Sequence, residues 1–155
     1  MIYLNNKPVI KTEMLIKRPV HEVFEAFINP EVTTKFWFSK SSGRLEAGKY
    51  IRWDWEIYGV WDEVFVRDIV ENKLIVIESS DGTTVEWLFT RRSDEHTLVT
   101  ITNQGFTGNG DDIVSQAVDA MGGYTMVLCG LKALLEHNVI LNLVADKSPD
   151  AHVID

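Results

Sequence analysis

Cysteine is nearly absent from this 155-residue chain, which contains one, Cys129. A single cysteine excludes an internal disulfide framework and any metal site built from several thiolates. Chains without disulfides are typical of reducing compartments, so a cytoplasmic protein is expected. We interpret Cys129 as a small buried thiol rather than a nucleophile, because no basic residue lies beside it in the sequence.

Positive charge is also scarce, with 15 Lys and Arg against 23 Asp and Glu and a formal net charge of -8. Such a chain repels phosphate backbones and anionic lipids, so neither nucleic acid nor a membrane surface is an expected partner. The N-terminus lacks a basic segment followed by an apolar run, and no stretch approaches the ~20 apolar residues that span a bilayer. The sequence predicts one domain over residues 1–155, with a core at about 9–137, a tail at 138–155 and no membrane insertion.

The first forty residues predict one strand and two short helices. Residues 9–17 place apolar and charged side chains on opposite parities, as a half-buried strand requires. Pro19 suits the first turn of a helix, and apolar residues then recur at spacings of three and four until Pro30 ends the pattern. A second short helix or turn ends in three consecutive aromatics, residues 36–38. These rings cannot all face one core, so at least one is expected to cover something else.

Residues 48–106 read as five antiparallel strands joined by short turns. One face of this meander is apolar and often aromatic, and the other is polar, so the dry face needs a cover. Residues 112–137 predict the only element long enough, a helix of about seven turns and ~40 Å. With the first strand, the pattern predicts an α+β fold in which a sheet of about six strands faces a long C-terminal helix.

Three glycines interrupt the long predicted helix, and each costs roughly 1 kcal/mol relative to alanine. Projected at 100° per residue, the expected core face is made of Ile113, Ala117, Ala120, Met121, Tyr124, Leu128, Leu131 and Leu135. Gly123 and Gly130 lie on the shoulder of this face, where they can admit sheet aromatics or a ligand close to the backbone. Gly122 faces away, and we expect it to contact the tail or a second subunit.

Several short motifs occur in an order that resembles a known family. The segment IKRPVHEVFEAFINPE at residues 16–31 is followed by KFWF, AGKY, GVWDEV and NQGF, and GGYTMVLCGLKALLEH closes the series. Over residues 10–137 this order is similar to the family named after the activator of the heat-shock-protein-90 ATPase, within the START-like (SRPBCC) superfamily. Tyr124 stands where that family has a tryptophan.

The resemblance implies a helix-grip fold, in which a curved antiparallel sheet wraps the long helix and leaves a cavity between them. Members of the family are mostly single small domains of undefined role. The co-chaperone that gives the family its name has an additional N-terminal domain, which we do not identify in this sequence. ATPase activation is therefore not expected.

No catalytic motif stands out. His21 and Glu25 are four residues apart, but a zinc-protease helix needs a second histidine that is missing. The chain has neither a nucleophile elbow nor a phosphate-binding loop. We therefore expect no metal, no cofactor and no catalytic residue.

Glu63 is the best polar candidate, and it matches the strand glutamate of the family that the chain resembles. It shares parity with Trp61 and Phe65, so it could point into the covered side and orient a ligand. The alternative is an ion pair with Arg52 or Arg67 that stabilises the sheet.

The aromatic residues predict a ligand-sized cavity, because small helix residues cannot fill the space beside them. Its expected lining is Trp37, Trp53, Trp55, Glu63, Trp87, Phe89, Met121, Tyr124 and Leu128. The ligand would be an apolar, lipid-like or aromatic (polyketide-like) small molecule. Two alternatives stay open: an enzyme such as a cyclase or hydrolase, although no convergent acid and base is visible, and a co-chaperone-like interaction module. The apolar helix back and the tail also offer a surface for a homodimer.

Overall fold

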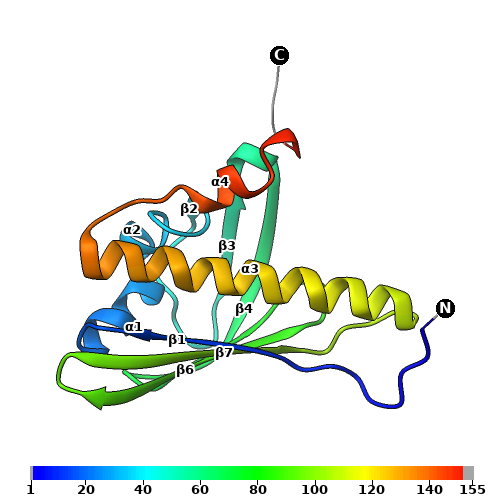
Figure 1. The fold of residues 1–155 in the computed structure, drawn as a ribbon, viewed down its shortest axis with the longest axis horizontal. Helices are drawn as coiled ribbons and strands as arrows, with labels where there is room; N and C mark the ends of the chain where they lie inside the picture. Colours follow the sequence, from blue (N-terminus) through cyan, green and yellow to red (C-terminus); the bar gives the residue numbers. More distant parts are fainter. Residues whose placement is uncertain (1, 152–155) are drawn as a thin grey trace.

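The computed structural model describes residues 2–151 and shows a curved sheet with one long helix along it (Figure 1). The elements are β1 (Ile10–Ile16), α1 (Val20–Ile28), α2 (Pro30–Thr33), β2 (Lys40–Ser41), β3 (Tyr50–Trp55), β4 (Val60–Val70), β5 (Leu74–Glu78), β6 (Thr84–Ser93), β7 (His96–Gln104), α3 (Gly110–His137) and α4 (Leu143–Lys147), with 3-10 turns at Glu56–Tyr58 and Pro149–Ala151. The predicted α+β class and helix-grip arrangement are confirmed. The end of the tail, residues 152–155, lies outside the described residues.

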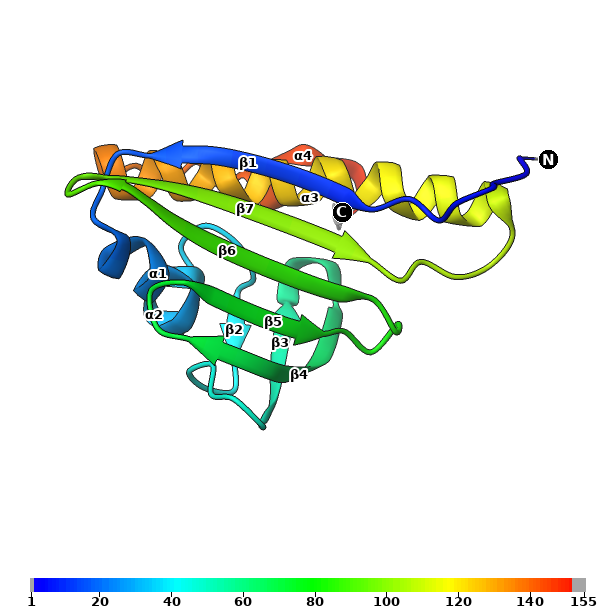
Figure 2. The same cartoon turned by 90° about the horizontal axis from the view of Figure 1, so that it is seen from below.

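Within residues 2–151, seven strands form one antiparallel sheet in the order β1-β7-β6-β5-β4-β3-β2. The sequence predicts about six strands, and the difference is β2, a two-residue edge strand paired with β3. Irregular register between Val66 and Asp68 and between Arg91 and Ser93 bends the strands. The sheet therefore curls beneath α3, as Figure 2 shows from below.

Prolines and an asparagine position the two short helices at one end of the sheet. Pro19 is the N-cap of α1, and Asn29 ends α1 and accepts a hydrogen bond from a backbone N–H of α2 at 3.0 Å. Phe27 of α1 is 3% exposed, and its ring centroid lies 6.0 Å from Trp87 and 5.9 Å from Phe89. These short helices therefore pack their apolar side into the centre of the core.

Reciprocal hydrogen bonds fix the start of α3. The Asn109 side chain accepts from the Asp112 N–H at 2.9 Å, and the Asp112 carboxylate accepts from the Asn109 N–H at 3.1 Å. This capping box starts the helix at Gly110 rather than at the predicted 112. Asn138 ends the helix in the left-handed conformation, with φ 52°.

The buried face of α3 is rotated from the predicted core face. Met121, expected in the core, is 41% exposed, whereas Val127 and Leu134 from the shoulder are buried. The reason is that α3 lies along β1, where the Thr125 and Thr12 hydroxyls hydrogen-bond at 2.8 Å.

The opposite face of α3 is more open than expected, since Cys129, interpreted as a buried thiol, is exposed. By length and composition α3 could cross a membrane, which corrects the expectation that no segment approaches that limit. Long core helices of water-soluble domains share this length and composition.

The three glycines of α3 have different surroundings. A Cβ at Gly130 would lie 3.3 Å from the Phe36 Cβ and 3.7 Å from the Leu143 Cδ1, so Gly130 permits the close approach of both the segment after α2 and the tail. Nothing lies within 4 Å of a Cβ at Gly122 or Gly123. The expected contact between Gly122 and the tail is therefore wrong, and Gly130 makes that contact instead.

Candidate ligand-binding site

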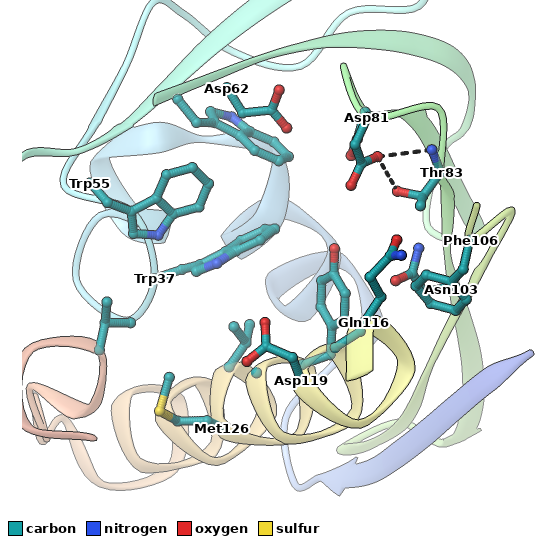
Figure 3. Close-up of a pocket in the computed structure, with 17 residues that line it drawn as sticks. Trp37, Trp55, Asp62, Asp81, Thr83, Asn103, Phe106, Gln116, Asp119 and Met126 are labelled. Atoms are coloured by element: carbon teal, nitrogen blue, oxygen red, sulfur yellow. Dashed lines mark hydrogen bonds between the residues drawn. The ribbon is translucent and has the colours of Figure 1, made fainter. Parts of the chain in front are cut away.

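A pocket of about 390 Å³ lies between α3, the β3–β4 part of the sheet and the β5–β6 loop (Figure 3). It is lined by Trp37, Trp53, Trp55, Asp62, Ser79, Asp81, Thr83, Asn103, Phe106, Gln116, Asp119, Ala120, Gly123, Tyr124, Met126, Val127 and Val144. Small-molecule sites occupy roughly 300–1,000 Å³, so this volume suits a compact ligand. Val144 belongs to α4, and its carbonyl accepts a hydrogen bond from the Tyr58 hydroxyl, which holds the tail at the pocket.

Indole rings form one wall of the pocket. The ring centroids of Trp37 and Trp55 are 6.2 Å apart, and that of Trp53 lies 4.9 Å from Trp37. Trp53 is 4% exposed, and its Nε1–H has no acceptor among the described residues. An unpaired buried donor costs about 1–3 kcal/mol. The wall is therefore mainly apolar but retains one unused donor.

Tyr124 brings a phenol from α3 to the pocket, with its ring centroid 6.1 Å from Trp37. Burial, and after it the negative charges of Asp81 and Asp62, raises the pKa of the Tyr124 phenol well above its ordinary value. The phenol therefore stays neutral and can donate a hydrogen bond. The preceding residue, Gly123, also lines the pocket and leaves open space at the position of a Cβ.

Three carboxylates from different elements complete the lining. In Figure 3, Asp62 of β4 and Asp81 of the β5–β6 loop lie on the sheet side, and Asp119 projects from α3. The Asp81 Oδ1 accepts hydrogen bonds from the Thr83 N–H at 2.9 Å and from its hydroxyl at 2.7 Å. The Asp62 Oδ1 accepts from the hydroxyl of Ser80. The lining contains no Lys, Arg or His.

The structure brings four of the predicted ligand-binding residues together in this pocket: Trp37, Trp53, Trp55 and Tyr124. Trp87, Phe89 and Leu128 are buried elsewhere in the core, with exposures of 2%, 4% and 0%, and do not line it. Met121 does not line it either, because the rotation of α3 turns its side chain outward.

The expectation that Glu63 points into the covered side is wrong. Val64 and Val66 are fully buried, so the other parity of β4 faces inward and Glu63 is exposed. Its neighbour Asp62 occupies the pocket. The alternative ion pairs are not seen among residues 2–151, since Arg52 and Arg67 pair with other carboxylates.

Sequence reasoning also missed the polar residues of the pocket. Gln116, Asp119, Gly123 and Val127 recur at spacings of three and four, so helix periodicity could have placed Asp119 on the line of Gly123. Asp81 lies in the β5–β6 turn, where an aspartate is common for conformational reasons alone. Nothing in the sequence around Asp81 marks it as a pocket residue.

The arrangement can stack a ring, hydrogen-bond to it and attract positive charge. Within residues 2–151, no group of three His, Cys, Asp or Glu side chains could hold a metal ion. The pocket carboxylates are therefore spread around a volume and do not converge on one point.

Residues 17–136 match the family model described as activator of Hsp90 ATPase homolog 1-like protein. The chain belongs to this family. The match confirms the family resemblance of the motifs, and it covers α3 up to Glu136 and every pocket residue except Val144 of α4. Among curated proteins, no sequence matches this chain.

Solved structures share the fold. The protein SSP2350 from Staphylococcus saprophyticus is 33% identical, with a TM-score of 0.76 over 86% of this chain and 96% of that one. The Aha1 dimer from Colwellia psychrerythraea is 18% identical, with a TM-score of 0.73 over 84% and 97% of the two chains. DynU16, a putative protein in the dynemicin biosynthetic locus, is 19% identical, with a TM-score of 0.75 over 85% of this chain and 48% of its own. The latter two similarities concern the fold alone.

Proposed function

We propose that this protein binds an apolar, ring-containing small molecule between its sheet and α3. The observation that carries the proposal is the half-buried aromatic wall of Trp37 and Trp55, which lies beside the neutral phenol of Tyr124 in a pocket with open space at Gly123. A flat ligand would remove this aromatic surface from water and add ring-to-ring contacts, and both are favourable. The fold of DynU16, from the dynemicin biosynthetic locus, supports a role with small molecules.

The pocket favours binding over turnover. A general acid or base works best when its pKa lies near the working pH. Burial, together with Asp81 and Asp62, moves the pKa of Tyr124 far from that range. The enzyme alternative, a cyclase or hydrolase, would also need an acid and a base that converge on the reacting atom, whereas the lining contains no histidine and its three carboxylates are spread around the pocket. The phenol is better suited to orient a ligand than to exchange a proton with it.

Gly123→Leu tests the proposal because it fills the pocket without disturbing the core. Nothing lies within 4 Å of its Cβ position, and leucine is favoured over glycine in a helix by up to ~1 kcal/mol. We expect an unchanged or raised melting temperature together with the loss of ligand binding. The ligands are three naphthalene probes, 2-(1-naphthyl)ethanol, 2-(1-naphthyl)ethylamine and 1-naphthylacetate, measured by isothermal titration calorimetry.

Gly122→Leu is the matched control, since it adds the same side chain to the same helix at an exposed position outside the pocket. It should gain the same helix stability and keep the affinity of the unaltered protein. The proposal fails if no probe binds the unaltered protein, or if the two variants bind equally.

We also propose that two copies associate through the outward face of α3. Val118 and Met121 are 68% and 41% exposed, and their spacing of three residues makes them neighbours on this face. Adjoining exposed apolar side chains are typical of interaction sites. The Aha1 of Colwellia psychrerythraea, which has this fold, was solved as a dimer.

A further inference from the structure

Three negative charges surround the pocket, and none has a positive partner there. Asp62, Asp81 and Asp119 come from a strand, a loop and a helix that are far apart in the sequence. None of them takes part in an ion pair within residues 2–151. A cleft lined by charge of one sign concentrates the field and attracts ligands of the opposite sign.

Each of these carboxylates has unused capacity to accept hydrogen bonds. The Oδ1 atoms of Asp62 and Asp81 accept from Ser80 and Thr83, and their Oδ2 atoms have no hydrogen bond among the described residues. Asp119 is exposed and makes no side-chain hydrogen bond in the same part of the chain. All three can therefore contact a donor on a ligand.

The geometry suits an organic cation better than a metal ion. Within residues 2–151 the carboxylates do not form a group that could hold a metal ion, whereas Trp37 and Trp55 provide aromatic rings in the same pocket. An ammonium group gains from aromatic faces and from carboxylates together, and it tolerates oxygen partners that are spread apart.

An indole N–H can only donate, and a nitrogen cation offers it no acceptor, so the unpaired Nε1–H of Trp53 does not select the charge of the ligand. The carboxylates of the lining do select it, because a wholly apolar ligand would leave all three without a positive partner.

We infer that the ligand of this pocket is a cationic amphiphile, a ring-containing apolar body that carries a protonated or quaternary nitrogen. The inference rests on the proposed binding function, because it names the class of molecule that the same site selects. The apolar body lies against the indole wall, and the nitrogen lies among Asp62, Asp81 and Asp119.

The three naphthalene probes test this inference because they share one ring system and differ in charge. By calorimetry at low salt, the amine should bind about tenfold or more tightly than the alcohol, and the acetate should bind more weakly than the alcohol. Raising the salt concentration should weaken the binding of the amine and leave the affinity for the alcohol unchanged.

Charge-removing variants locate the effect. Asp119→Asn and Asp62→Asn should each reduce the affinity for the amine about three- to tenfold, with the affinity for the alcohol unchanged. Asp68→Asn is the matched control, because it removes one exposed carboxylate from β4, the strand of Asp62, outside the pocket lining. It should leave binding of all three probes unchanged.

The outcomes separate the inference from the proposed function. One outcome is that the unaltered protein binds all three probes with equal affinity and Gly123→Leu binds none of them. This result would support the proposed binding function and overturn the preference for a cation. An equal loss of amine affinity in Asp68→Asn and Asp62→Asn would also overturn the inference, since the affinity would then depend on the net charge of the chain and not on the carboxylates of the pocket. If no probe binds the unaltered protein, the binding function itself fails.

Discussion

A single carboxylate links the end of α3 to β1. The Glu136 Oε2 accepts hydrogen bonds from the Lys132 ammonium at 2.6 Å and from the Lys17 N–H at 3.1 Å, and the Glu136 side chain is 9% exposed. Burial acts to raise the pKa of Glu136, but the hydrogen bonds from Lys132 and Lys17 and nearby positive charge outweigh it and lower the pKa below its ordinary value. The ionised form therefore stabilises the fold.

Glu136→Gln should lower the free energy of unfolding by about 1 kcal/mol at neutral pH. Because the folded-state pKa is lowered, the contribution is complete above about pH 4.5, the ordinary value, and is lost as the pH falls through the folded-state pKa. Urea unfolding of both proteins at neutral and acidic pH measures the difference, which should vanish in acid. Glu86→Gln, at an exposed position of β6, is the control and should change little at either pH. A difference that persists in acid would contradict the assignment.

At this scale the sequence predicts ring residues better than charged ones. The three aromatics at 36–38 require that one ring leave the core, and Trp37 does line the pocket. The choice between Asp62 and Glu63 could not be made, because β4 carries apolar residues on both parities, with Trp61 and Phe65 on one and Val64 on the other. Only packing against the rest of the sheet shows which parity is buried.

Helix α4 is the element that the sequence indicates least clearly. It contributes Val144 to the pocket lining. The chain before it looks like an apolar tail, and the contacts that position it include the hydrogen bond from the Tyr58 hydroxyl to the Val144 carbonyl and the close approach at Gly130. Neither contact has a local pattern, since the partners are far apart in the sequence. The cap of α3 is different, because Asn109 and Asp112 form a local motif that predicts a helix start.

Tyr58→Phe should loosen α4 while the rest of the fold stays intact. We expect faster amide hydrogen exchange at residues 143–147 and weaker binding of the naphthalene probes, because Val144 lines the pocket. Hydrogen-exchange mass spectrometry reads the first effect and calorimetry the second. Tyr50→Phe removes a hydroxyl from a 68% exposed tyrosine and should change neither. Unchanged exchange in Tyr58→Phe would show that the hydroxyl does not hold the helix.

The exposed face of α3 has consequences for the whole molecule. If two copies associate there, Val118→Asp places like charges against each other and should shift the molecule to a monomer, with little loss of stability because the site is 68% exposed. Multi-angle light scattering across a concentration series measures the mass. Val9→Asp, at a 54% exposed position before β1, is the control and should leave the mass unchanged. A monomer in all three proteins would exclude this interface.

The order of elements is readable from sequence because each depends on neighbouring residues, and the shared motifs place the elements in a family. The acidic character of the pocket is not readable, since it arises only when β4, the β5–β6 loop and α3 meet. The net charge of -8 gives a hint of its sign but not of its location.

The indole rings close to the pocket provide an intrinsic spectroscopic signal for ligand binding. With the Trp37 centroid 4.9 Å from Trp53, 6.2 Å from Trp55 and 5.9 Å from Trp87, the excited states of these rings couple. The near-ultraviolet circular dichroism should therefore contain an exciton signal that changes when another ring enters the group. Trp61 is 57% exposed, lies beneath the Arg52 guanidinium at 4.3 Å, and contributes a steady emission against which that change can be followed.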